Sequence, residues 1–115
     1  MIDDVFCKIA SGEIKSDFIY RDEDFMVLKD INPQAPIHLL IIPVRHFEKI
    51  DDIKSKNAGL LGKGLLIADK VAHDVGLGDR GYRLIINEGE DGGKLVPHLH
   101  IHLLGGKKLG PKIVR

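Results

Sequence analysis

The sequence predicts an α+β fold built around a five-stranded, mainly antiparallel sheet. Two helical patterns, one short and one long, and five strand-sized segments support this prediction. Their order is a helix, three strands, a long helix and two strands, which lacks the regular alternation that a parallel sheet requires. The chain has 115 residues and neither a repeat nor a linker, so we expect a single domain over residues 1–115.

A short helix near the N-terminus comes first. Asp3 or Asp4 can cap it, because a carboxylate accepts hydrogen bonds from the unpaired N–H groups of a first turn. Gly12 suits the exit of this helix. Its apolar side carries Val5, Phe6 and Ile9.

The chain then predicts three strands, over residues 18–20, 25–28 and 38–42. The acidic turn at residues 21–24 makes the first two strands a hairpin. Pro33 and Pro36 lack the backbone donor that a helix interior needs. We therefore expect residues 30–36 to form an ordered loop that leads into the third strand.

Residues 54–75 predict the long helix, because apolar residues recur there at steps of three and four. The repeating residues are Leu61, Leu65, Ala68, Ala72 and Val75. Gly76 ends the pattern. Two last strands, over residues 82–87 and 98–104, flank a glycine-rich loop at residues 88–97.

Composition argues against several functional classes. The formal net charge is +0, which gives no electrostatic basis for binding nucleic acid. No apolar run approaches the roughly 20 residues of a membrane helix, and the acidic N-terminus does not resemble a secretory signal. Cys7 is the lone cysteine and cannot form an internal disulfide. We expect a cytoplasmic protein that binds neither nucleic acid nor membrane.

Three of the six histidines lie at alternate positions of the last predicted strand, at His98, His100 and His102. Successive side chains of a strand point to opposite faces, so these imidazoles share one face and the apolar residues between them share the other. Three interpretations remain open on spacing alone. The face could be solvated and without a role, it could hold zinc, or one neutral imidazole could act as a nucleophile while its neighbours orient it.

The loop before this strand bears on the choice. Its glycines let backbone N–H groups turn toward an anion such as phosphate, and Asn87 and Lys94 can add donors. The alternative is a plain hairpin loop, since glycines most often serve turn geometry. Taken alone, Asp30 could be a turn residue and His38 a structural histidine.

The His-x-His-x-His pattern in residues 97–106 resembles the signature of the histidine triad (HIT) family of nucleotide-binding proteins. Residues 6–9, 30–38 and 87–93 resemble the family's other landmarks, in the same order. The resemblance covers nearly the whole chain. It is strongest to the purine nucleoside phosphoramidase branch.

The resemblance implies a HIT-like homodimer in which two five-stranded sheets join, acting on purine nucleotides such as AMP or GMP and their phosphoramidates without a cofactor. His100 would attack the α-phosphorus and form a covalent nucleotidyl-histidine, which water would hydrolyse. His102 would contact the phosphate oxygens, His98 would support the triad, and His38 would orient it from behind. The rival functions are a nucleotide-binding regulatory or scaffold protein, a dinucleoside polyphosphate hydrolase and a zinc-binding protein.

The same resemblance assigns the nucleotide contacts. Asn87 and the Gly93 backbone would hold the phosphate, and Asp30 would accept hydrogen bonds from the ribose hydroxyls, a role that suits a carboxylate. The residues that match the family's base pocket are Val5, Phe6, Ile9, Leu28, Ile31 and Leu40.

The chain departs from the family pattern at three places. After Gly93 the family commonly has glutamine and then a small hydroxyl residue, whereas this chain has Lys94 and Leu95. We expect Lys94 to place its charge near the phosphate or leaving group. The tail at residues 107–115 is basic and contains no tryptophan, which suggests a preference for acidic leaving groups or partners.

The third departure concerns zinc. Many bacterial relatives bind structural zinc through two cysteines and two histidines, but Asp4 stands where the first cysteine would fall. The weaker set Asp4, Cys7, His46 and His98 remains possible, and we expect no metal. Because one imidazole must attack while another, charged, donates, we also expect a bell-shaped pH profile near neutrality.

Overall fold

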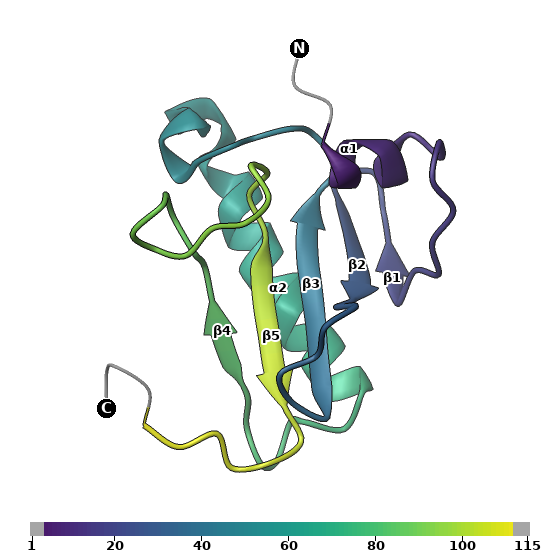
Figure 1. Ribbon diagram of the computed structural model, residues 1–115, viewed down its shortest axis with the longest axis vertical. Helices are drawn as coiled ribbons and strands as arrows, with labels where there is room; N and C mark the ends of the chain where they lie inside the picture. The colour runs from purple at the N-terminus through teal and green to yellow at the C-terminus, as the bar shows by residue number, and fades with distance from the viewer. Residues whose placement is uncertain (1–3, 112–115) are drawn as a thin grey trace.

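A computed structural model describes residues 4–111 and confirms the predicted α+β fold. Five strands form one sheet in the order β1-β2-β3-β5-β4, and every neighbouring pair is antiparallel (Figure 1). The elements are α1 (Val5–Ala10), β1 (Tyr20–Arg21), β2 (Phe25–Lys29), β3 (Ile37–Pro43), two 3-10 turns (Ile50–Asp52 and Ser55–Asn57), α2 (Ala58–Asp74), β4 (Arg83–Ile85) and β5 (Ile101–Gly105). No helix in this part of the chain is long and apolar enough to cross a membrane.

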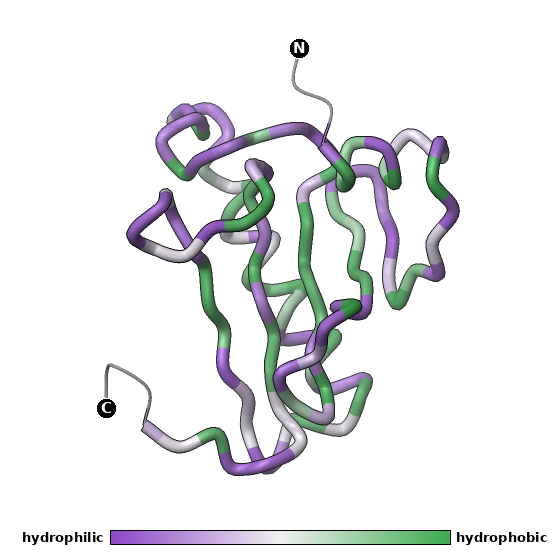
Figure 2. Tube along the Cα trace, viewed as in Figure 1, coloured by the Kyte–Doolittle hydropathy of each residue, from purple (hydrophilic) through white to green (hydrophobic). Residues whose placement is uncertain are grey.

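Each face of the sheet buries apolar side chains against a different helix. Helix α2 lies behind the sheet in Figure 1, and α1 lies in front of its upper part. On the α2 side, residues such as Val27, Ile41 and Leu103 are fully buried. On the other side, Met26 and Ile42 pack with Phe6 of α1. On this second face, His38 of β3 and His102 of β5 lie beside the apolar cluster, and Figure 2 shows a mostly hydrophobic sheet interrupted by hydrophilic positions.

The N-terminal elements form largely as predicted. The Asp4 carboxylate caps α1 by accepting a hydrogen bond from the Cys7 N–H at 2.8 Å, whereas Asp3 lies outside the described residues. In the hairpin turn, Asp22 Oδ1 accepts bonds from the N–H groups of Asp24 and Phe25. The first strand is shorter than predicted and covers only Tyr20–Arg21.

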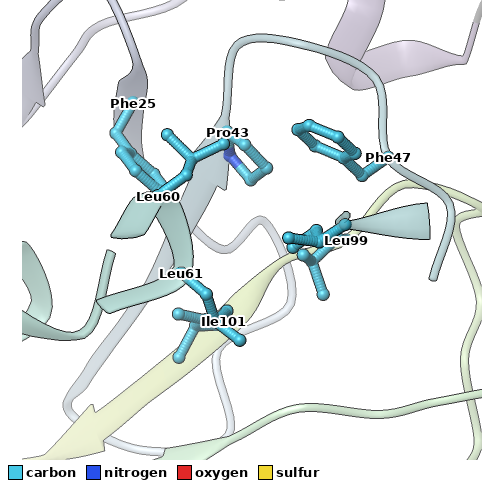
Figure 3. Close-up of a pocket in the computed structure, with 8 residues that line it drawn as sticks. Phe25, Pro43, Phe47, Leu60, Leu61, Leu99 and Ile101 are labelled. Carbon is cyan, nitrogen blue, oxygen red and sulfur yellow. The ribbon is translucent and has the colours of Figure 1, made fainter. Parts of the chain in front are cut away.

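Helix α2 approaches the sheet closely through a glycine. A Cβ atom at Gly64 would lie 2.8 Å from Phe25 Cζ, so this position requires glycine. Leu60, Leu61 and Ile101 line a small space beside Phe25 (Figure 3). The buried face is rotated from the predicted stripe, because Leu65 is 43% exposed. The residues actually buried are Gly64, Ile67, Ala68, Val71 and Ala72.

The last strand begins later than the sequence predicts. Strand β5 starts at Ile101, so His98 and His100 lie in the extended segment that precedes it. The Leu99 N–H donates to the Phe47 backbone oxygen at 2.6 Å, which ties this segment to the chain that leaves β3. The alternation of side chains nevertheless holds, since Leu99 and Ile101 are buried on the α2 side.

Candidate active site

The register of β3 and β5 brings the predicted histidines together. His102 lies opposite Leu40, and His38 lies opposite Leu104, so the two histidines are diagonal neighbours on one face of the sheet. The rings of His38 and His102 are 5.2 Å apart, and those of His100 and His102 are 5.0 Å apart. His98 and His100 are buried immediately upstream.

The ring of His100 is fixed through one nitrogen. Its Nδ1 lies 2.6 Å from the backbone oxygen of His98. A carbonyl oxygen can only accept, so Nδ1 carries the proton and the neutral ring keeps its lone pair on Nε2. Burial lowers the pKa of His100, and the nearby charge of Lys94 lowers it further. Both effects keep His100 neutral and able to act as a nucleophile.

A chain of hydrogen bonds sets the proton on His102. The Gln34 backbone N–H donates to His38 Nδ1 at 3.0 Å, so a neutral His38 carries its proton on Nε2. That Nε2 lies 2.9 Å from His102 Nδ1 and donates to it. The proton of His102 is therefore on Nε2. Burial, followed by the neighbouring histidines, lowers the pKa of His102 to about 4, so the ring donates a hydrogen bond while uncharged.

A cavity of about 400 Å³ opens beside His100 and His102. It is lined by most of the residues that the sequence assigned to the nucleotide, namely Val5, Phe6, Ile9, Leu28, Asp30, Ile31, Leu40, Asn87 and Gly93. Four other lining residues were missed by sequence reasoning: Ser16, Lys29, Asn32 and Val96. Ser16 lies in the irregular segment between α1 and β1, where no periodicity points to a side chain's direction. Leu95 also lines the cavity and is 94% exposed.

Asp30 presents a carboxylate to this cavity. Its Oδ1 accepts the Asn32 N–H at 2.8 Å, as expected for a turn aspartate. Its Oδ2 lies 3.4 Å from His38 Nε2. The turn role and a ligand role are therefore compatible, because each oxygen can accept further hydrogen bonds.

The glycine-rich loop is closed by its own hydrogen bonds. Asn87 Nδ2 donates to the Gly92 oxygen at 2.7 Å, and the Gly93 N–H donates to the Glu90 oxygen at 3.0 Å. A Cβ atom at Gly92 would lie 2.2 Å from the Glu88 oxygen. These contacts give the glycines a role in the turn, and the Gly93 N–H is bonded within the loop.

The Lys94 side chain is held by groups outside the cavity. Its ammonium group donates to the Glu48 backbone oxygen and lies 3.4 Å from Glu88 Oε1. Its side chain is 8% exposed, and Lys94 is not among the residues that line the cavity. Lys94 therefore acts on the site through its charge and by holding the loop.

His98 also belongs to a second cluster of side chains that could bind a metal. The cluster contains Asp4, Cys7, His46 and His98, and their ligand atoms all lie within 4.8 Å of one another. Asp4 Oδ2 is 3.0 Å from His46 Nδ1 and 3.1 Å from His98 Nδ1. Cys7 Sγ is 3.4 Å from His46 Nδ1. Sulfur, imidazole and carboxylate are all ligands that zinc accepts, so this set has the composition of a tetrahedral metal site.

The protons of His98 also suit an arrangement without a metal. Its Nε2 donates to the Pro43 backbone oxygen at 2.8 Å, and its Nδ1 faces the Asp4 carboxylate. Both ring nitrogens of His98 therefore have partners within the protein. Burial alone would raise the pKa of Asp4, but the Cys7 N–H and the His98 ring bring it below its ordinary value.

Comparisons with known proteins agree with this geometry. The HIT domain model matches residues 11–109. The purine nucleoside phosphoramidase of Escherichia coli (strain K12) is 42% identical over 109 residues, which cover 95% of this chain and 92% of that protein. A HIT family hydrolase from Clostridium thermocellum has a TM-score of 0.93 at 47% identity, with 99% of both chains covered. A histidine triad protein from Clostridium difficile gives 0.92 at 40% identity, with 97% of both chains covered. The chain belongs to the HIT domain family.

Proposed function

We propose that this protein hydrolyses derivatives of purine nucleoside monophosphates at the α-phosphorus, through a covalent intermediate on His100. One observation carries the proposal: the His98 backbone oxygen holds the Nδ1 proton of His100, so the lone pair of Nε2 remains for attack at a cavity of nucleotide size. The similarity to a purine nucleoside phosphoramidase supports the same substrate class.

In the first step, His100 Nε2 forms a bond to phosphorus. The bond from phosphorus to the leaving nitrogen breaks, and the nitrogen keeps the electron pair and takes a proton from solvent. The uncharged His102 donates its Nε2–H to a phosphoryl oxygen, whose negative charge grows as the new bond forms. His38 acts through His102 and is a positioning residue.

In the second step, water attacks the phosphorus of the nucleotidyl-histidine. The bond between phosphorus and Nε2 breaks and returns its electron pair to His100, and the proton of the water passes to solvent. The products are the nucleoside monophosphate and regenerated His100. The two steps together consume one water and no net proton, so the cycle is balanced as a hydrolysis.

We place the nucleoside against the apolar side chains of the cavity. Apolar side chains such as Phe6, Leu28 and Leu40 suit the faces of a purine, and the Asp30 carboxylate accepts hydrogen bonds from the ribose hydroxyls. With the nucleoside in this place, the α-phosphate lies between His100 and His102.

We further propose that two copies pair through β4. This strand contains only Arg83–Ile85 and bonds to β5 on one side, so within residues 4–111 its other edge has no strand partner. Pairing with the same edge of a second copy would join two five-stranded sheets. Light scattering on the purified protein tests this proposal, and a monomer at micromolar concentration would contradict it.

We also propose that no metal resides between Asp4 and His98. The Asp4 carboxylate already has hydrogen-bond partners in the Cys7 N–H and the His98 ring, and His98 Nε2 is engaged by the Pro43 backbone oxygen. Protein purified without an affinity tag should contain well under one equivalent of zinc by elemental analysis. A stoichiometric zinc content, lost together with thermal stability on chelation, would show the opposite.

Turnover of adenosine 5′-phosphoramidate is the test of the enzymatic proposal. We expect the native chain to release AMP, and His100→Ala to abolish release while retaining AMP binding. Binding without turnover by the native chain would indicate a regulatory or scaffold protein. Faster turnover of a dinucleoside polyphosphate than of any phosphoramidate would indicate a dinucleoside polyphosphate hydrolase instead.

A further inference from the structure

A second cavity lies on the other side of His102. It has a volume of about 210 Å³ and shares His102 and Asn87 with the cavity assigned to the nucleoside. Gln34, His38 and Arg83 also line it. Because His102 lines both cavities, a phosphorus atom held beside that ring is next to the nucleoside cavity and to this second space.

The strand register places Arg83 on the face of the catalytic histidines. Ile85 lies opposite His102, and Arg83 lies opposite Leu104 on the next residue pair of the same face. Leu104 in turn lies opposite His38 on β3. Residues that oppose one another in an antiparallel pair point to the same side of the sheet. Arg83 therefore shares the face of His38 and His102, one strand farther out.

The guanidinium group of Arg83 is held in place, but not all of its hydrogen-bond donors have acceptors within residues 4–111. The chain after β5 folds back, and Arg83 Nη2 donates to the Gly110 backbone oxygen. Arg83 Nη1 is buried and has no hydrogen-bond partner among residues 4–111. Buried charged donors are almost always paired, because leaving one without an acceptor costs free energy. An acceptor supplied by a ligand would complete this group.

The surroundings of Arg83 favour an anion. Arg80, Lys107 and Lys108 line an adjoining cavity of about 400 Å³ that Arg83 borders as well. Within the described chain, no carboxylate lines either of these two cavities. The protein has a formal net charge of +0, so this concentration of cations is local.

We propose that the second cavity binds the leaving group and that Arg83 selects leaving amines that carry a carboxylate. A planar guanidinium group matches a carboxylate through two parallel hydrogen bonds. In a phosphoramidate of an α-amino acid, the carboxylate is attached to the carbon next to the leaving nitrogen. It therefore lies in the space beside His102 when the phosphorus faces His100. This inference rests on the proposed hydrolysis and names the class of its leaving group.

The test compares two substrates of nearly equal size, the adenosine 5′-phosphoramidates of glycine and of glycinamide. We expect the native chain to favour the glycine substrate in kcat/KM by about tenfold or more, the range that one charge-assisted hydrogen-bonded pair supplies. In Arg83→Gln the ratio of the two kcat/KM values should fall toward one, and Arg83→Lys should retain part of it. Lys15→Gln is the matched control, because Lys15 is exposed and lines neither of these two cavities, and it should keep the native ratio.

The outcomes separate this inference from the proposed hydrolysis. If the native chain hydrolyses unsubstituted adenosine 5′-phosphoramidate but treats glycine and glycinamide substrates alike, the role of Arg83 is wrong and the hydrolysis stands. If it hydrolyses none of the three, the proposed hydrolysis fails first. If Arg83→Gln slows both substrates equally and changes the oligomeric state, Arg83 is an interface residue and the inference is overturned. The native comparison needs no variant, so a misfolded mutant leaves the test intact.

Discussion

His38 Nε2 lies 2.9 Å from His102 Nδ1, and this contact determines which nitrogen of His102 carries the proton. The assignment begins at the Gln34 backbone N–H, which can only donate and therefore makes His38 Nδ1 an acceptor. A backbone group thus sets, through two imidazoles, which nitrogen of His102 can donate a hydrogen bond in the cavity. His38 needs no contact with substrate to matter for catalysis.

Replacing His38 with phenylalanine should therefore impair kcat while leaving nucleotide affinity largely intact. The variant removes the donor to His102 Nδ1, and the loss of one such hydrogen bond corresponds to about a 10- to 100-fold decrease in kcat. His38→Gln, which can donate through its amide, should recover part of the rate. Steady-state kinetics on both variants checks this, and equal kcat values for the phenylalanine and glutamine variants would argue against a positioning role.

The pH dependence should show a single acid limb. Burial lowers the pKa of His100 below its ordinary value of 6.5, and the pKa of His102 is lowered to about 4. Attack requires the unprotonated Nε2 of His100, so activity is retained at neutral pH and is lost as pH falls through this lowered pKa. The bell-shaped profile expected from sequence assumed a charged donor, but the neutral His102 already carries a proton on Nε2.

We expect kcat/KM to stay level between about pH 8 and pH 6.5 and to decline below that range. The measurement is kcat/KM for adenosine 5′-phosphoramidate at constant ionic strength. A decline that begins above about pH 7 would mean that His100 titrates at or above the ordinary histidine range.

Replacing Lys94 with methionine should shift the acid limb of the pH profile to higher pH. The positive charge of Lys94 disfavours protonation of His100, so its removal raises the pKa of that ring. The same variant should lose about 1–3 kcal/mol of stability, because the Glu48 oxygen loses its donor. Lys15→Met, at an exposed position, is the control. An unshifted limb would show that Lys94 has no electrostatic effect on the nucleophile.

Asp30→Asn should weaken binding of ribonucleotides selectively. The asparagine keeps an oxygen for the Asn32 N–H but loses the charge that strengthens hydrogen bonds from ribose hydroxyls. We expect KM to rise about tenfold for adenosine 5′-phosphoramidate and to change little for its 2′,3′-dideoxy analogue. An equal rise in KM for both substrates would mean that the substitution acts by disturbing the turn, and it would argue against a contact between Asp30 and the ribose.

Much of this arrangement could be predicted from residue pattern. The alternation at His98, His100 and His102 placed three imidazoles on one face, and the order of strand segments gave an antiparallel sheet. Local patterns could not predict where Lys94 points, because its partner Glu48 is distant in sequence. They also missed the rotated buried face of α2, which depends on the close approach at Gly64 to Phe25.

Arg83 was missed although a signal was present. It stands two positions before Ile85 in a short apolar strand, and the period of two puts both on the same face. A sequence shows the charge but does not show which neighbouring strand shares that face, and the proximity of Arg83 to His102 depends on that pairing.

The most direct measurement is mass spectrometry of protein mixed with adenosine 5′-phosphoramidate and denatured within a single turnover at alkaline pH. An adenylyl group should appear on the peptide that spans residues 98–102, with fragment ions placing it on His100, and His100→Ala should carry none. Full turnover without an adduct at any sampled time, or an adduct on His102, would contradict nucleophilic attack by His100.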